Sequence, residues 1–139
     1  MQRFTSHSPE QTEQIACEFA KKLRAGDVVA LRGGMGAGKT AFVRGLARGL
    51  DVTDEVASPT FALVHEHEGR IPLYHFDMYR VTTMDDLYST GFFDYLDTGA
   101  VLAVEWSENI ENALPSGHLT VTLTRISDTE REIVIEGRE

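Results

Sequence analysis

The sequence is poor in cysteine, in basic residues and in long apolar runs. Its single cysteine, Cys17, cannot form a disulfide within the chain, so a small disulfide-stabilised secreted fold is excluded. No apolar stretch approaches the ~20 residues that a membrane-spanning helix needs. The first residues, MQRFTSHSPEQ, also lack the basic and then apolar pattern of a secretory signal. We therefore expect a cytoplasmic protein without membrane association.

Basic residues are too few to offset the acidic ones. The chain has 13 Lys and Arg against 22 Asp and Glu, which gives a formal net charge of −9, and the basic residues form no run. A surface of this charge repels a phosphate backbone. If RNA belongs to the pathway of this protein, we expect a partner to hold it.

The 139 residues fit one domain, residues 1–139. Ser8 is placed to cap a helix that begins at Pro9 and ends near Arg24, before Gly26. A buried strand at 27–32, a glycine-rich turn and a helix from Lys39 to about Gly49 follow. The remaining pattern predicts a hairpin of strands 61–66 and 71–74, short helices after Thr82 and Gly91, and strands at 100–106, 118–124 and 130–136.

The glycine-rich turn matches the phosphate-binding loop G-x-x-x-x-G-K-[ST]. It reads Gly33-Gly34-Met35-Gly36-Ala37-Gly38-Lys39-Thr40 and lies between a predicted strand and a predicted helix, as the motif requires. Its backbone N–H groups and the helix N-terminus would cradle phosphates. Lys39 would reach the β and γ phosphates, and the Thr40 hydroxyl would point at Mg²⁺. The fold class is therefore α/β, a single P-loop NTPase-like domain with a mixed parallel and antiparallel central sheet flanked by helices.

Two acids end predicted strands at the edge where such a loop collects phosphates and Mg²⁺. Glu105 follows the apolar run 101–104, and Asp77 follows 73–76. We interpret Glu105 as a magnesium ligand and Asp77 as the acid that orients the attacking water, although the pattern alone also allows the reverse. A zinc site built from His65, His67 and His75 is the weaker hypothesis, because no cysteine is near and Mg²⁺ prefers oxygen ligands.

Four motifs in order from about Ser8 to Trp106 resemble the bacterial TsaE (YjeE) family. They are the phosphate loop, Ser58-Pro59-Thr60-Phe61, the run from His75 to Arg80 (HFDMYR) and Val104-Glu105-Trp106. The chain departs from the family at Gly34-Met35, where an acid and then Leu are usual, and at Phe61, where Tyr is common.

The resemblance implies a P-loop ATPase that joins the TsaB and TsaD proteins in forming N6-threonylcarbamoyladenosine at position 37 of tRNA, with tRNA contacted only through that complex. ATP and Mg²⁺ would be its cofactors. Residues 33–39 would hold the triphosphate, Thr40 and Glu105 the metal, and Asp77 would be needed for hydrolysis. Thr60 would belong to a switch-like loop, and Trp106 and Arg131 would lie by the nucleotide.

Three other functions could use a phosphate-binding loop. A GTPase is disfavoured because neither N-K-x-D nor D-x-x-G occurs in the sequence. A small-molecule kinase needs a lid over an acceptor pocket, and the chain has little length for one. A nucleotide sensor or scaffold that binds ATP without hydrolysing it stays open.

Overall fold

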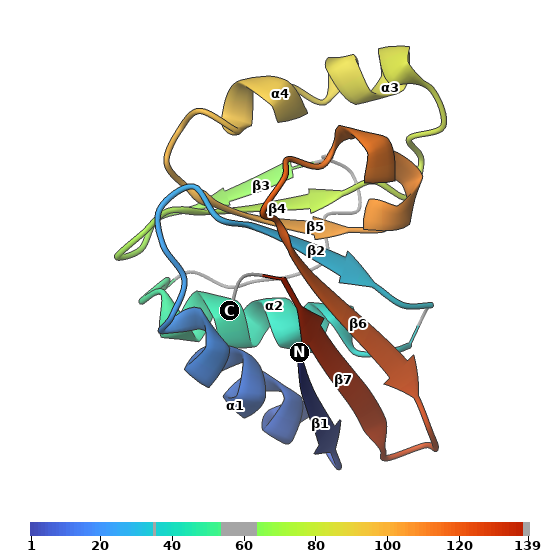
Figure 1. Ribbon diagram of the computed structural model, residues 1–139. Coiled ribbons are helices and arrows are strands. Elements are labelled where there is room, and N and C mark those ends of the chain that lie inside the picture. Colours follow the sequence, from blue (N-terminus) through green and yellow to red (C-terminus); the bar gives the residue numbers. More distant parts are fainter. Residues whose placement is uncertain (35, 54–63, 138–139) are drawn as a thin grey trace.

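The computed structural model describes residues 1–34, 36–53 and 64–137, which form one α/β unit around a seven-stranded sheet (Figure 1). The strand order is β1-β7-β6-β2-β5-β4-β3. The four central strands β6, β2, β5 and β4 run parallel, and the pairs β1–β7, β6–β7 and β3–β4 are antiparallel. The expected mixed sheet is confirmed. The strands are β1 (Gln2–Ser6), β2 (Val28–Arg32), β3 (Val64–His67), β4 (Leu73–Asp77), β5 (Val101–Glu105), β6 (Leu119–Arg125) and β7 (Arg131–Glu136).

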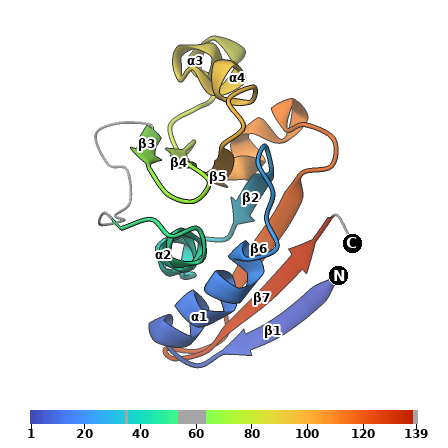
Figure 2. The ribbon, with the colours of Figure 1, turned by 90° about the vertical axis from the view of Figure 1, so that its left-hand side faces the viewer.

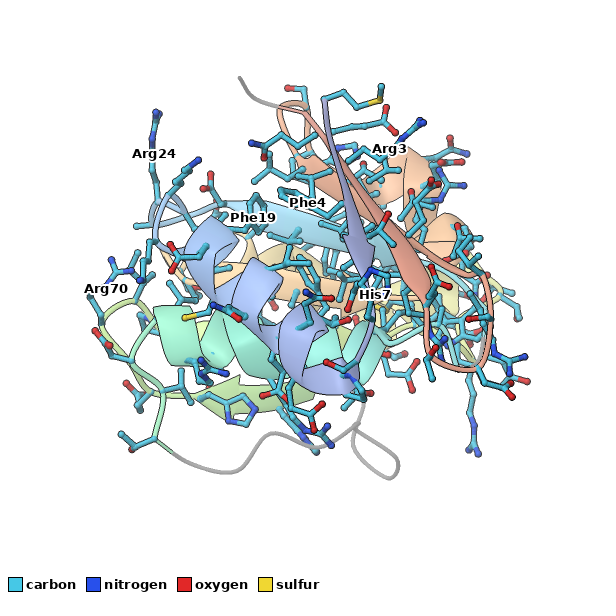
Figure 3. All side chains as sticks on the ribbon, turned by 90° about the horizontal axis from the view of Figure 1, so that it is seen from below. Arg3, Phe4, His7, Phe19, Arg24 and Arg70 are labelled. Carbon is cyan, nitrogen blue, oxygen red and sulfur yellow. The ribbon has the colours of Figure 1, made fainter. Side chains whose placement is uncertain are left out.

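Helices cover both faces of the sheet. One face carries α1 (Pro9–Ala20) and α2 (Lys39–Gly49), and the other carries α3 (Met84–Ser89), α4 (Phe92–Tyr95) and the 3₁₀-helix η1 (Ser107–Ala113) (Figures 1 and 2). Side chains alternate along β2, so that Val29 and Leu31 enter the core under α1 and α2 while Val28 enters the core under α3 and α4. Figure 3 views the first face and labels Phe4 and Phe19, which pack against its core.

The α1–α2 contact depends on two glycines. A Cβ on Gly45 would lie 2.2 Å from the Glu13 carbonyl oxygen, and one on Gly49 would lie 2.5 Å from the Ala20 Cβ. The two glycines are four residues apart and therefore share one face of α2. Their missing side chains let α1 and α2 pack closely against each other on one face of the sheet.

Helix ends follow the sequence prediction with two corrections. Ser8 caps α1 by accepting the Gln11 N–H at 3.0 Å, but α1 ends at Ala20 and not near Arg24. The cap of α3 is Thr83, whose hydroxyl accepts the Asp86 N–H at 3.0 Å, so that α3 begins at Met84 and not directly after Thr82.

Two elements were not predicted: strand β1 and the 3₁₀-helix η1. Within the described residues, no helix is both long and apolar enough to cross a bilayer.

Candidate functional site

The candidate residues lie at the carboxyl ends of three neighbouring parallel strands, at one edge of the sheet. The glycine loop follows β2, Glu105 ends β5 and Asp77 ends β4. In the register, Leu31 is opposite Glu105, and Glu105 is opposite Asp77. A pocket of about 450 Å³ opens here, and its lining consists of Gly36, Ala37, Gly38, Lys39, Thr40, Ala41, Asp77, Tyr79, Glu105 and Trp106.

The loop geometry accounts for its glycines. Gly36 and Gly38 have φ of +77° and +100°, in the region that side chains disfavour. Gly33 has φ of +146°, and a Cβ there would lie 2.5 Å from the Leu123 carbonyl oxygen. The chain therefore curls between β2 and α2, and α2 directs its N-terminus into the pocket. Met35 lies outside the described residues.

Lys39 is the cation of the pocket. Its side chain is buried, with Nζ donating to the Gly33 carbonyl at 2.7 Å and lying 3.9 Å from the centroid of the Trp106 ring. Burial lowers the pKa of the ammonium, and the negative charges of Glu105, Glu108 and Asp77 oppose that shift. A bound anion would stabilise the buried ammonium and would therefore raise its pKa again.

Glu105 is almost wholly buried, although it was expected to face a metal. It is 4% exposed, and its Oε2 is hydrogen-bonded to Nε2 of His75, which has no exposed surface. Within the described part of the chain, no hydrogen bond reaches Glu105 Oε1, and Glu105 lines the pocket. One carboxylate oxygen is thus held by the protein, and the other remains for a ligand.

Asp77 lies beside Glu105 and is half-buried. Its Oδ1 accepts the Tyr79 N–H at 2.9 Å, which turns the chain at the end of β4. The two acids therefore line one pocket together with the lysine and the threonine, as the sequence predicted.

Trp106 has left-handed backbone angles, φ 57° and ψ 39°, which turn the chain from β5 into η1. Its ring lies 4.9 Å from the Tyr79 ring, between centroids. Two hydrogen bonds hold this turn in place. Ser107 Oγ donates to the Leu31 carbonyl at 3.1 Å, and Asn109 Nδ2 donates to the Met78 carbonyl at 2.8 Å. Neither residue was predicted from the sequence. Both bonds join distant parts of the chain, so no local pattern signals them.

Arg131 does not line this pocket. It lines an adjoining one of about 260 Å³, which shares Gly38 and Ala41 with the first and also includes His7, at the end of β1 in Figure 3. The Arg131 guanidinium donates to the carbonyls of Ser127 and Glu130 at 2.7 and 3.0 Å. Thr60 lies outside the described residues. In the described ranges, no group of three or more His, Cys, Asp or Glu is placed to hold a metal ion.

Comparison with known proteins is consistent across sequence and structure. Residues 6–133 match the family model "Threonylcarbamoyl adenosine biosynthesis protein TsaE". The chain is 37% identical to the TsaE protein of Treponema pallidum over 133 residues, which cover 96% of this chain and 98% of that protein. It is 42% identical to TsaE of Bacillus subtilis over 127 residues, or 91% of this chain and 79% of the relative.

A solved structure gives the same result. The crystal structure of YdiB from Bacillus subtilis superposes with a TM-score of 0.82 at 36% identity, covering 98% of this chain and 84% of that one. The chain belongs to the TsaE family, whose members take part in tRNA threonylcarbamoyladenosine biosynthesis.

Proposed function

We propose that this protein is a Mg²⁺-dependent ATPase that acts with TsaB and TsaD, in the cytoplasm, to support threonylcarbamoyladenosine formation in tRNA. Family membership supports the pathway. The observation that carries the ATPase proposal is the single pocket where the glycine loop, Lys39, Thr40, Asp77 and Glu105 meet.

The nucleotide is proposed to lie with its phosphates in the larger pocket. Loop N–H groups and the N-terminus of α2 favour an anion there, and Lys39 would exchange its bond to the Gly33 carbonyl for phosphate oxygens. The adjoining pocket, which Arg131 and His7 help to line, shares Gly38 and Ala41 with the larger one. We therefore place the ribose and base of the same nucleotide there. Met35 and Thr60 remain predicted nucleotide contacts.

The metal-binding donors are hard oxygens, as Mg²⁺ requires. Thr40, on the first turn of α2, and Glu105, with Oε1 free of hydrogen bonds in the described chain, line the same pocket. We propose that these two residues hold Mg²⁺. The ion, when bound, would neutralise charge on the β and γ phosphates.

Asp77 is proposed to orient the water that attacks the γ-phosphate. Its carboxylate is next to Glu105 in the register but, within the described part of the chain, accepts only the backbone N–H of Tyr79. A carboxylate with remaining acceptor capacity can position a water and take its proton. We therefore expect Asp77 to affect turnover more than nucleotide binding.

The test is ATP hydrolysis, with and without TsaB and TsaD, by the wild type and by Lys39→Ala, Asp77→Asn and Asp97→Asn. Lys39→Ala should lose nucleotide affinity. Asp77→Asn should bind ATP and lose about 100-fold or more in turnover. Asp97, an exposed residue away from the pocket, is the matched control and should change nothing.

Two results would contradict the proposal. Wild-type protein that binds ATP but never hydrolyses it, even with its partners, would favour the sensor or scaffold. Unchanged turnover in Asp77→Asn would remove Asp77 from the chemistry.

A further inference from the structure

His75 is a buried polar residue to which the proposed reaction assigns no role. It lies on β4 two residues before Asp77, so both side chains project to the same face of the sheet. The neighbouring strand β5 places Ala103 opposite His75 and Glu105 opposite Asp77. Glu105 is therefore diagonal to the imidazole, close enough for the hydrogen bond between Nε2 and Oε2.

The direction of this bond follows from the two groups. A carboxylate oxygen can only accept, so the imidazole Nε2 must carry the hydrogen and donate it. The other ring nitrogen, Nδ1, is buried and has no hydrogen-bond partner among the described residues. A hydrogen on Nδ1 would thus find no acceptor there, and the tautomer with hydrogen on Nε2 fits the site.

The bond restricts the Glu105 side chain. Glutamate has three rotatable torsions, and a buried carboxylate without a donor would turn toward whichever donor it can reach. Here Oε2 is occupied by His75, and the side chain cannot rotate away without breaking that bond. Oε1 makes no hydrogen bond within the described part of the chain, and Glu105 lines the same pocket as Thr40 and Asp77.

We propose that His75 is the positioning residue of the metal site: its Nε2–H holds the Glu105 carboxylate so that Oε1 faces Mg²⁺ bound with the nucleotide. This rests on the proposed function. Hydrogen-bond partners behind metal ligands commonly change metal affinity by about 10–100-fold when they are removed.

Two substitutions separate a positioning role from a merely structural one. His75→Gln carries an amide nitrogen at about the reach of Nε2 and can still donate to Glu105. His75→Asn is equally polar but shorter, and it withdraws the donor. His118→Asn is the matched control, because that ring bonds to the Pro115 carbonyl and does not line the pocket.

The readout is ADP affinity by titration calorimetry, first in EDTA and then over a range of Mg²⁺ concentrations, with melting temperature as a check of folding. In His75→Asn, the ADP affinity in EDTA should stay within about twofold of the wild-type value. The Mg²⁺ concentration that gives half of the maximal increase in ADP affinity should rise about 10–100-fold. His75→Gln should recover most of this loss. If His75→Asn does not fold, His75→Leu, which suits the apolar neighbours Leu73 and Ala103, replaces it.

A double variant tests whether His75 acts through Glu105. In a Glu105→Gln background, His75→Asn should cause no further loss of Mg²⁺ dependence. If wild-type protein shows no ADP binding or no Mg²⁺ dependence, the proposed function itself fails. If the wild type shows both and His75→Asn matches it, only the positioning role of His75 is wrong.

Discussion

At the scale of single residues, the phosphate loop and the two acids could be predicted because each is marked by its own neighbours. Glu105 and Asp77 follow apolar strands, and Lys39 lies within a motif. The bond between His75 and Glu105 could not be predicted, because it depends on the register between β4 and β5. The sequence therefore indicated Glu105 as a candidate metal ligand, but it suggested only a zinc site for His75.

Lys39 gives a pH prediction. Burial holds its pKa below the ordinary value in the empty pocket, whereas phosphate contacts would raise the pKa in the complex. Binding then takes up protons between these two pKa values, so nucleotide affinity should fall as pH rises through the pKa of the empty state, by at most about tenfold per pH unit.

Calorimetry in buffers of different ionisation enthalpy measures this proton uptake directly. Lys39→Arg is the control, because arginine stays charged across the same range. Equal proton uptake by the wild type and this variant would show that another group titrates.

At the scale of elements, local signals predicted the strand, glycine loop and helix that build the pocket, but not β1 or η1. Strand β1 has mostly exposed residues and forms only because β7 pairs with it, Gln2 opposite Ile135. Helix η1 depends on Trp106 adopting left-handed angles and on bonds to distant carbonyls. Both elements are products of long-range contacts.

The α1–α2 packing gives a stability prediction. Gly45→Ala places a methyl group against the Glu13 carbonyl and the Ala16 Cβ, and such overpacking costs about 1–3 kcal/mol. Urea unfolding of the nucleotide-free protein should show a lower midpoint. Gly34→Ala is the matched control, since a Cβ there meets nothing within 4 Å. An unchanged midpoint in Gly45→Ala would mean that the helices separate at little cost.

At the scale of the whole molecule, the net charge gives a prediction about tRNA binding. A formal charge of −9 opposes binding to a polyanion. The protein alone should leave tRNA unretarded in a gel-shift assay at physiological salt, whereas the mixture with TsaB and TsaD should retard it. Tight binding by the isolated protein, with a steep dependence on salt, would contradict the indirect contact proposed here.

The position of the chain's only tryptophan has a practical consequence. Trp106 lines the proposed nucleotide pocket, with the Lys39 ammonium 3.9 Å from its ring centroid and the Tyr79 ring beside it. A nearby cation alters indole emission, and a ligand that draws Lys39 away removes that cation from the ring. The tryptophan emission of the protein, excited at wavelengths that tyrosine does not absorb, therefore comes from one known place and should report, without any label, whether that place is filled.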